Sequence, residues 1–487
     1  MSAPSLHWFR DDLRLADNPA LTASVEHGPT LCLYILDEPG SRRALGGSSR
    51  WWLSRSLAAL AAAIASKGGE LVLMRGDPAE ILPRVVEAAR VDLVTWSRRY
   101  DAESIELDSR LKTEVAALGV KVASFNAALL NEPWQVKTKT GEPMKVFTPY
   151  WRAARALGEP PAPIPAPDRI EPLKLTDGIR EMNLALTDLA LEPTKPDWAG
   201  GLRQAWTPGE ETAAERLGEF LSGPLDGYGE GRDRPDKAST SRLSPHLRFG
   251  EIGPRQIWHA TRSAMESGEA SAGSTDAEKF LSEVGWREFS YHLLFQNPDL
   301  ATQNYNRRFD AFPWQQDEAA LKAWQRGLTG YPIVDAGLRE LWTTGWMHNR
   351  VRMIAASFLI KHLLIDWRQG EAWFWDTLVD ADPASNAASW QWVAGSGADA
   401  SPYFRIFNPV TQGLKFDPKG AYVRRWIPEI AALDGDLIHE PWKADAQSLR
   451  RAGIVLGETY PAPIVELDFG RRRALDALAA TLSAEPE

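Results

Sequence analysis

The sequence lacks cysteine almost entirely, because Cys32 is the single cysteine among 487 residues. Internal disulfides and cysteine-ligated metal clusters are therefore excluded, and a reducing compartment fits the chain. Long apolar runs are also missing: the longest, from Leu57 to Ala65, is far too short to cross a bilayer. The opening residues, MSAPSLHWFRDDLRL, do not have the basic-then-apolar layout of a secretion signal. We therefore expect a cytoplasmic protein without a membrane partner.

An excess of positive charge is missing as well. The formal net charge is −10, which argues against a polybasic coat for nucleic acid. A local basic patch can nevertheless act within a few Debye lengths, whatever the total charge is. We find no internal repeat and no long low-complexity tail. Tryptophan is the residue in excess, with 21 copies in a chain of otherwise ordinary globular composition.

Residues 1–130 alternate short apolar runs with amphipathic segments. This alternation predicts a parallel sheet with helices on both faces, in a Rossmann-like α/β domain. The Gly-rich turn of a dinucleotide site is absent after the first run, where the sequence reads RDDLRLADNP. The predicted strands are Leu6–Phe9, Thr30–Leu36, Glu70–Met74, Asp92–Trp96 and Val120–Ser124. The predicted helices between them include Ser48–Lys67, Asp77–Ala89 and Asp101–Leu118.

The remainder of the chain divides into a linker, residues 131–200, and a mainly helical domain, residues 201–487. Gly158–Pro172 is too rich in proline for a helix or a central strand. Helical patterns dominate from Trp206 onward. The Ser/Gly-rich stretch Ser263–Ala277 predicts an exposed loop within them.

The segment Trp346–Asn408 mixes tryptophans with cationic and amide side chains. This mixture suits a flat charged ligand or a nucleobase. On a helix, Trp346, Asn349, Arg350 and Met353 would share one face. The alternative is a plain aromatic core, which many tryptophans form. The arginines, aspartates and asparagines in the segment favour the ligand.

Three further patterns each allow a functional and a structural interpretation. Residues 240–244 form a hydroxyl-rich turn that suits either a phosphate or a helix cap. Glu283, Trp286 and Arg287 fall within one helical turn, where Glu283 with Arg287 could be an ordinary surface ion pair. The acidic loop around Asp380 and Asp382 lacks a histidine at metal-ligand spacing, so no metal site is expected.

Several motifs resemble the DNA photolyase and cryptochrome family. They are WFRDDLRLADNPAL near the N-terminus, YGEGRDRPDKASTSRLSPHLRFGE from Tyr228, and GWMHNRVRM, DADPASNAASWQW and PYFRIFNP in the tryptophan-rich segment. The resemblance extends from Trp8 to about Leu478. It implies an antenna-binding α/β domain, an α-helical FAD-binding domain, and repair of cyclobutane pyrimidine dimers in DNA by electron transfer from light-excited reduced FAD.

The resemblance also assigns residues to FAD. The residues that it implies are Tyr228, Thr240, Ser241, Arg242, Leu243, Ser244, Phe280, Glu283, Arg287, Trp346, Asn349, Arg352, Asp380, Ala381, Asp382 and Asn386. In this set Asp380 is expected to pair with Arg352, and Asn386 to face flavin N5. Some relatives carry tryptophan where this chain has Phe280. Since an asparagine does not readily donate a proton to N5, Asn386 favours an enzyme that holds fully reduced, anionic flavin.

The residues that the resemblance places against damaged DNA form a second set. They are Arg232, Glu283, Trp286, Asn349, Arg350, Met353, Trp392 and Arg405. Asn349 and Met353 stand where enzymes for the six-four photoproduct carry two histidines, which favours the cyclobutane dimer. Glu283 and Asn386 are the expected catalytic side chains, together with an electron route through Trp314, Trp367 and Trp390.

Two questions remain open from the sequence. The antenna is either methenyltetrahydrofolate or a flavin-type pigment, because Glu103 and Ser104 replace the Asn-Glu pair of folate-binding relatives. The alternative function is that of a cryptochrome, a blue-light photoreceptor without repair activity. Asn386, the absence of a long tail, and the Glu283, Trp286 and Trp392 pocket argue against it. No obligate protein partner is expected, and the chain is expected to be a monomer.

Overall fold

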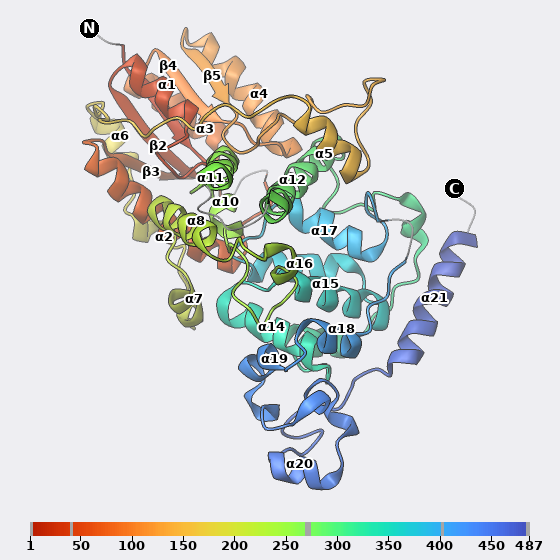
Figure 1. Cartoon of the computed structure of the whole chain (residues 1–487). Helices are drawn as coiled ribbons and strands as arrows, with labels where there is room; N and C mark the ends of the chain where they lie inside the picture. Colours follow the sequence, from red (N-terminus) through yellow and green to blue (C-terminus); the bar gives the residue numbers. More distant parts are fainter. Residues whose placement is uncertain (1–2, 39–41, 268–273, 401–403, 484–487) are drawn as a thin grey trace.

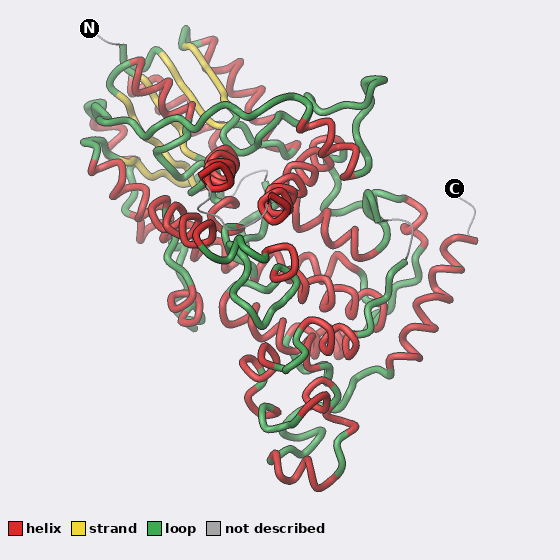
Figure 2. The backbone as a smooth tube through the Cα atoms, in the orientation of Figure 1, coloured by secondary structure: helices red, strands yellow, loops and turns green. Residues whose placement is uncertain are grey.

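The structure, a computed structural model, describes residues 3–38, 42–267, 274–400 and 404–483. All strands of the main sheet lie at one end of the molecule, and helices make up most of the remainder (Figures 1 and 2). In the described part of the chain, no helix combines the length and the apolar character needed to span a membrane.

The N-terminal region is a five-stranded parallel sheet in the order β3-β2-β1-β4-β5. Its strands are β1 Ser5–Phe9, β2 Thr30–Leu36, β3 Leu71–Arg75, β4 Leu93–Ser97 and β5 Lys121–Phe125. Its helices are α1 Pro19–His27, α2 Gly47–Ser66, α3 Pro78–Ala89 and α4 Ala102–Ala117. The predicted α/β arrangement is therefore confirmed. β1 and β2 are buried along their whole length, as strands covered on both faces must be.

The central segment is less irregular than its composition predicts. Residues 158–171 form neither helix nor strand, in keeping with their prolines. Short helices nevertheless flank this stretch. They are α5 Phe147–Arg155, α6 Asp177–Met182, the 3₁₀ turn Leu186–Leu189 and α7 Gly200–Ala205.

The C-terminal half is helical. Its helices are α8 Glu210–Ser222, α9 Tyr228–Gly231, α10 Ser244–Arg248, α11 Pro254–Ser267, α12 Ser274–Gln296, α13 Glu318–Gln325, α14 Pro332–Thr344, α15 Asn349–Ser357, α16 Trp367–Thr377, α17 Ser385–Ala394, α18 Pro409–Phe416, α19 Ala421–Trp426, α20 Ala446–Ala452 and α21 Leu467–Ser483. The largest apolar core of this half lies among α14 to α17 and includes Trp324, Trp367 and Trp390.

Two predictions about local structure are wrong. The stretch 263–277 is not a loop throughout, since α11 continues to Ser267 and α12 begins at Ser274, with residues 268–273 outside the described part. Trp346 does not share a helix with Asn349, because α15 begins at Asn349 and the side chain of His348 caps it. A capping side chain satisfies the free N–H groups of a first turn and so fixes where the helix starts.

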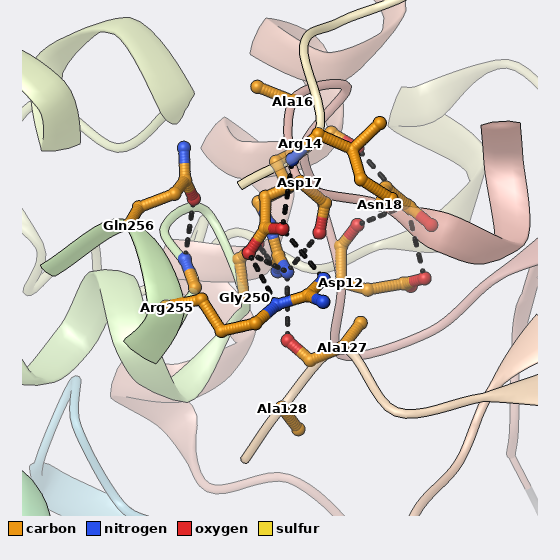
Figure 3. Close-up of polar contacts among 12 residues, drawn as sticks. Asp12, Arg14, Ala16, Asp17, Asn18, Ala127, Ala128, Gly250, Arg255 and Gln256 are labelled. Atoms are coloured by element: carbon orange, nitrogen blue, oxygen red, sulfur yellow. Dashed lines mark hydrogen bonds and ion pairs between the residues drawn. The ribbon is translucent and has the colours of Figure 1, made fainter. Parts of the chain in front are cut away.

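The two halves meet at a set of charged side chains, which we call the junction network: Asp12, Arg14, Asp17, Glu210 and Arg255. Asp12, Arg14 and Asp17 are buried, and Glu210 and Arg255 are partly buried. Figure 3 shows Asp12, Arg14, Asp17 and Arg255. Arg14 donates to the carbonyl oxygens of Asp17, Ala127 and Gly250 at 2.7, 2.8 and 2.9 Å. Asp17 pairs with Arg255 at 2.6 Å. Figure 3 shows both arginines converging on Asp17 from different parts of the chain.

Backbone contacts complete this junction. Glu210 of α8 accepts hydrogen bonds from the backbone N–H groups of Leu15 and Ala16 at 2.7 and 2.8 Å. Gly250 has a φ of +68°, and a Cβ there would overlap the backbone of Asp11. Only glycine therefore allows the two backbones to approach this closely. The signature RDDLRLADN thus serves as the surface that joins the two halves.

Candidate functional site

The hydroxyl-rich turn before α10 lies against the acidic loop before α17. Ser244 donates to Asp380 Oδ2 at 2.6 Å, and Arg352 donates to the same oxygen at 2.8 Å. The indole Nε1 of Trp346 lies 3.4 Å from Ser244 Oγ. The guanidinium of Arg242 lies 4.9 Å from the centroid of the Trp346 ring. We call these five side chains, Arg242, Ser244, Trp346, Arg352 and Asp380, the Ser244 cluster; the expected pairing of Asp380 with Arg352 is confirmed.

The Ser244 cluster keeps polar capacity that the chain does not use. Asp380 Oδ1 and Arg242 Nε are buried, and no described residue hydrogen-bonds to either atom. Buried polar atoms without partners are rare in folded proteins. Arg242 has a φ of +52°, an uncommon conformation for a residue other than glycine, and such conformations gather at functional sites. Two cations beside hydroxyl groups suit a diphosphate group.

Asp382 lies next to this cluster on the acidic loop and is buried. Its Oδ2 accepts a hydrogen bond from the Tyr291 hydroxyl at 2.8 Å, and its Oδ1 accepts from the N–H groups of Ala384 and Ser385. Burial and the neighbouring Asp382 charge raise the pKa of Tyr291, so this phenol stays a donor. Arg287 lies over the Tyr291 ring at 4.8 Å and donates to the Ala128 carbonyl.

Asn386 on α17 is held by α16. Its Nδ2 donates to Glu371 Oε1 at 2.8 Å and to the Glu371 carbonyl at 3.1 Å. Arg43 from the N-terminal half pairs with Glu371 through both carboxylate oxygens, at 2.7 and 3.0 Å. Analysis of the sequence missed Glu371, Arg43 and Tyr291. A role for Tyr291 could have been predicted, because it lies four residues after Arg287 and therefore on the same face of the helix.

A second group of expected residues gathers between α9 and α12. Arg232 forms an ion pair with Glu283, and Lys279 lies 3.5 Å from the same carboxylate. Tyr228 and Phe280 are buried neighbours whose ring centroids are 5.6 Å apart. The α12 helix therefore carries Glu283 and Trp286 as predicted.

The ring of Trp286 stacks on Phe147, with centroids 3.7 Å apart and planes 10° apart. On α15, Arg350 pairs with Asp233 at 2.8 Å, while Asn349 is exposed and Met353 is half-buried. Trp392 on α17 is half-buried and donates to the Asp399 carbonyl at 3.1 Å. These side chains combine cations with an aromatic face, as nucleic-acid sites do.

Arg405 has an exposed side chain. Its guanidinium lies over the Phe407 ring, and its carbonyl oxygen accepts a hydrogen bond from Lys361.

The three expected electron-transfer tryptophans belong to one apolar core. Trp367 and Trp390 are buried in it, and Trp314 packs against it while partly exposed. Trp390 lies 6.1 Å from Trp324 and 5.0 Å from Phe374, measured between ring centroids. Trp390 is buried, whereas Trp392, two residues later on α17, is half-buried.

Comparison with known proteins agrees with this arrangement. Residues 5–168 match the DNA photolyase family model, and residues 280–480 match the FAD binding domain of DNA photolyase. The chain is 52% identical to the deoxyribodipyrimidine photo-lyase of Agrobacterium fabrum over 98% of both chains. It is 40% identical to cryptochrome-1 of Arabidopsis thaliana over 98% of this chain and 70% of that protein. The chain therefore belongs to the photolyase and cryptochrome family.

A solved structure points to the same family. The crystal structure of a bacterial class III photolyase from Agrobacterium tumefaciens superposes with a TM-score of 0.95 at 52% identity, covering 99% of this chain and 98% of that one. The helical half is thus a photolyase FAD-binding domain. The unpartnered Nε of Arg242 and the two cations of the Ser244 cluster fit the diphosphate of FAD, whereas Asp380 Oδ1, a carboxylate oxygen, fits a donor such as a hydroxyl group of the ligand.

Proposed function

We propose that this protein is a light-dependent deoxyribodipyrimidine photo-lyase, which splits cyclobutane pyrimidine dimers in DNA. The observation that carries the proposal is the 52% identity, from end to end, with a photo-lyase. When FAD is bound and reduced, it supplies an electron to the dimer after absorbing blue light. Every other requirement, namely binding, orientation and exclusion of water, falls to the side chains of this chain.

The Ser244 cluster is proposed to hold the diphosphate of FAD. The backbone N–H groups of residues 240–244 offer donors, while Arg242 and Arg352 offer charge. Asp380 accepts hydrogen bonds from the Ser244 hydroxyl and from Arg352 through one oxygen, which fixes both side chains in a single arrangement. Tyr228 and Phe280 line the buried side near α9, and Asp382 with Arg287 and Tyr291 is proposed to line the flavin ring.

Damaged DNA is proposed to bind over α12 and α15. A dimer must leave the base stack, and its poor stacking lowers the cost of flipping. Trp286, held flat by Phe147, offers a stacking face, and Glu283, oriented by Arg232, offers a hydrogen-bond acceptor to the bases. Asn349, Met353 and Trp392 are proposed to line the same pocket. Arg232, Arg350 and Arg405 are proposed to contact phosphates, which position the duplex without reading its sequence.

Trp314, Trp367 and Trp390 are proposed to return electrons to the flavin. Trp367 and Trp390 are buried in one apolar core, and the partly exposed Trp314 packs against the same core, which supports a route from the surface to the interior. Trp367 is held in place by its hydrogen bond to Asn304 at 2.9 Å.

A second chromophore is proposed to bind at the carboxyl ends of β1, β2 and β4, where open α/β sheets bind ligands. Asp37 follows β2 there, both of its oxygens are buried without a partner among the described residues, and burial raises its pKa. Arg42, Arg99 and Asp101 surround it. By contrast, Ser104 is buried in α4 beside exposed Glu103, so this pair offers a poor folate site.

The test is repair of an irradiated thymine oligonucleotide under blue light, with a dark control. Cofactors released by heat and separated by chromatography should include one FAD per chain, together with a second pigment if the antenna site is used. A chain that carries FAD and responds to light but leaves dimers intact would be a cryptochrome-like photoreceptor, the alternative that the similarity to Arabidopsis cryptochrome-1 favours. We also propose that the protein acts as a monomer in the cytoplasm, without an obligate protein partner.

A further inference from the structure

One short segment of the N-terminal half, residues 43–47, lies against α16. Trp375 of α16 donates to the Ala44 carbonyl at 2.8 Å, and the N–H group of Gly47 donates to Asp376 at 2.8 Å. A Cβ on Gly46 would overlap the backbone of Trp375 and Asp376, so the two backbones are in direct contact. These contacts fix where the segment lies along α16.

Arg43 is thereby placed on the carboxylate of Glu371. Its guanidinium meets both oxygens, at 2.7 and 3.0 Å, and lies 4.3 Å from the centroid of the Trp375 ring. Glu371 is almost fully buried, whereas Arg43 keeps 40% of its side chain exposed. Among the described residues, no other basic side chain pairs with Glu371. A buried carboxylate is costly without such a partner, so Arg43 supports its charge.

The charge on Glu371 determines the orientation of the side-chain amide of Asn386. An ionised carboxylate and a backbone carbonyl only accept hydrogen bonds, so the edge of Asn386 that faces them must be the NH₂ group. The carbonyl oxygen Oδ1 then faces away from Glu371. No described residue donates a hydrogen bond to that oxygen.

We propose that Arg43 is a positioning residue that sets the flavin redox balance from the other half of the molecule. Through Glu371 it holds Asn386 with Oδ1 free for the flavin. A carbonyl oxygen accepts a hydrogen bond from the N5–H of reduced flavin and offers none to the bare N5 of oxidised flavin. The arrangement therefore favours reduced FAD. This inference rests on the proposed function and on the place beside flavin N5 that the family resemblance implies for Asn386.

The experiment measures the ratio of reduced to oxidised bound FAD at one fixed applied potential. This ratio reports the midpoint potential of the flavin. Arg43→Gln should lower this ratio by roughly three- to tenfold, the value of one hydrogen bond of ordinary strength. Arg43→Lys should restore most of it, because the charge beside Glu371 returns. The matched control is Arg55→Gln, since Arg55 is a similarly exposed arginine on α2 that pairs with Glu192 away from α16.

Glu371→Gln extends the test. A glutamine both donates and accepts, so it no longer dictates the orientation of the Asn386 amide, and the ratio should fall in the same direction. Since Arg43 acts through Glu371, the double variant Arg43→Gln/Glu371→Gln should fall no further than Glu371→Gln alone. Additive losses, or equal losses in Arg43→Gln and Arg55→Gln, would overturn the proposal.

Thermal unfolding of the flavin-free protein separates positioning from simple stability. Without flavin we expect Arg43→Gln to melt below Arg55→Gln, because it leaves the buried Glu371 carboxylate without its partner. The proposal requires in addition that Arg43→Gln changes the flavin potential and that Arg55→Gln does not. If Arg43→Gln alone loses melting temperature and the potential does not move, Arg43 only joins the domains and the proposal fails. A chain that binds no FAD would instead overturn the proposed function, so the two failures are distinguishable.

Discussion

The junction network and the Ser244 cluster both contain buried charged side chains, but they use their polar atoms differently. In the junction network, the terminal nitrogens of Arg14 donate to three backbone oxygens, and both oxygens of Asp17 meet Arg255. Each group leaves an arginine Nε without a partner, Arg14 in the junction network and Arg242 in the Ser244 cluster. The carboxylates differ: both oxygens of Asp17 are paired within the chain, whereas Asp380 Oδ1 has no partner among the described residues. A carboxylate that is paired on both oxygens stabilises the fold, whereas one with a free buried oxygen can still bind a ligand.

The sharpest way to separate function from stability is Trp314→Phe. This change should abolish photoreduction of oxidised flavin while leaving repair by pre-reduced enzyme largely intact, because the tryptophan route recharges the flavin and does not touch the dimer. The measurements are flavin absorbance under blue light with an external reductant and dimer repair after chemical reduction. Equal loss of both activities would make Trp314 a structural residue, and Trp442→Phe, on the same core away from the route, is the control.

Arg14→Met in the junction network should have the opposite effect, a loss of stability without a loss of flavin binding. Removing one partner of a buried ion network should lower the free energy of unfolding by about 3–5 kcal/mol. The flavin-binding residues stay untouched, so flavin per folded molecule should not change. Denaturant titration of this variant beside Arg84→Met, an exposed arginine on α3, gives the comparison. A loss as small as that of the control would show that the junction does not hold the halves together.

Trp286→Ala tests the DNA side of the site. Loss of a stacking face should weaken binding of dimer-containing DNA by about 1–3 kcal/mol and leave intact DNA unaffected. Arg405→Ala should instead weaken both DNAs and reduce the slope of log affinity against log salt by about 0.9, the counterion release of one phosphate contact. Salt titrations with irradiated and intact oligonucleotides measure both. If Trp286→Ala weakened intact DNA equally, the pocket would be misplaced.

A further effect is a pH dependence at Glu288, which lies outside the junction network. Glu288 on α12 is buried and accepts hydrogen bonds from the N–H groups of Leu130 and Asn131, and burial raises its pKa to about 7. Between its ordinary pKa and 7 the folded protein binds more protons than the unfolded chain does. Stability should therefore fall as the pH rises through this window, by up to about 1.4 kcal/mol per pH unit.

Glu288→Gln keeps an acceptor and removes the titration, so the slope of stability against pH should flatten. Urea titrations at several pH values, beside Glu106→Gln on the exposed face of α4, provide the measurement. An unchanged slope would mean that Glu288 does not cause the pH dependence.

The strands could be predicted to within a residue at each end, because buried parallel strands are short apolar runs between turns. The loop prediction for 263–277 failed because tertiary contacts outweigh composition. Asp276, inside α12, accepts hydrogen bonds from the N–H groups of Gly227 and Gly229 and ties the helix start to α9. Such a contact has no local pattern.

The same limit applies to the site. Asp380 with Arg352 could be expected, since family motifs carry both. The contact of Arg43 with Glu371 could not, because 328 residues separate the partners and no periodicity links them. Trp286 could be placed on its helix but not stacked on Phe147, which comes from α5. Contacts between side chains from segments that are far apart in the sequence are therefore found only in the structure.

The close backbone approach at Gly250 has a consequence for recombination between relatives. A chimera can take its sheet domain from one family member and its helical domain from another. It must then keep glycine at position 250, because a side chain there would overlap the backbone of the sheet domain. It must also keep the acceptor at Glu210 and the cation at Arg255, which pair with residues of the sheet domain. The two domains therefore cannot be exchanged between relatives independently of each other. Crossover points for building hybrid light-driven repair enzymes belong in the proline-rich stretch 158–171, which contributes no helix or strand to either half.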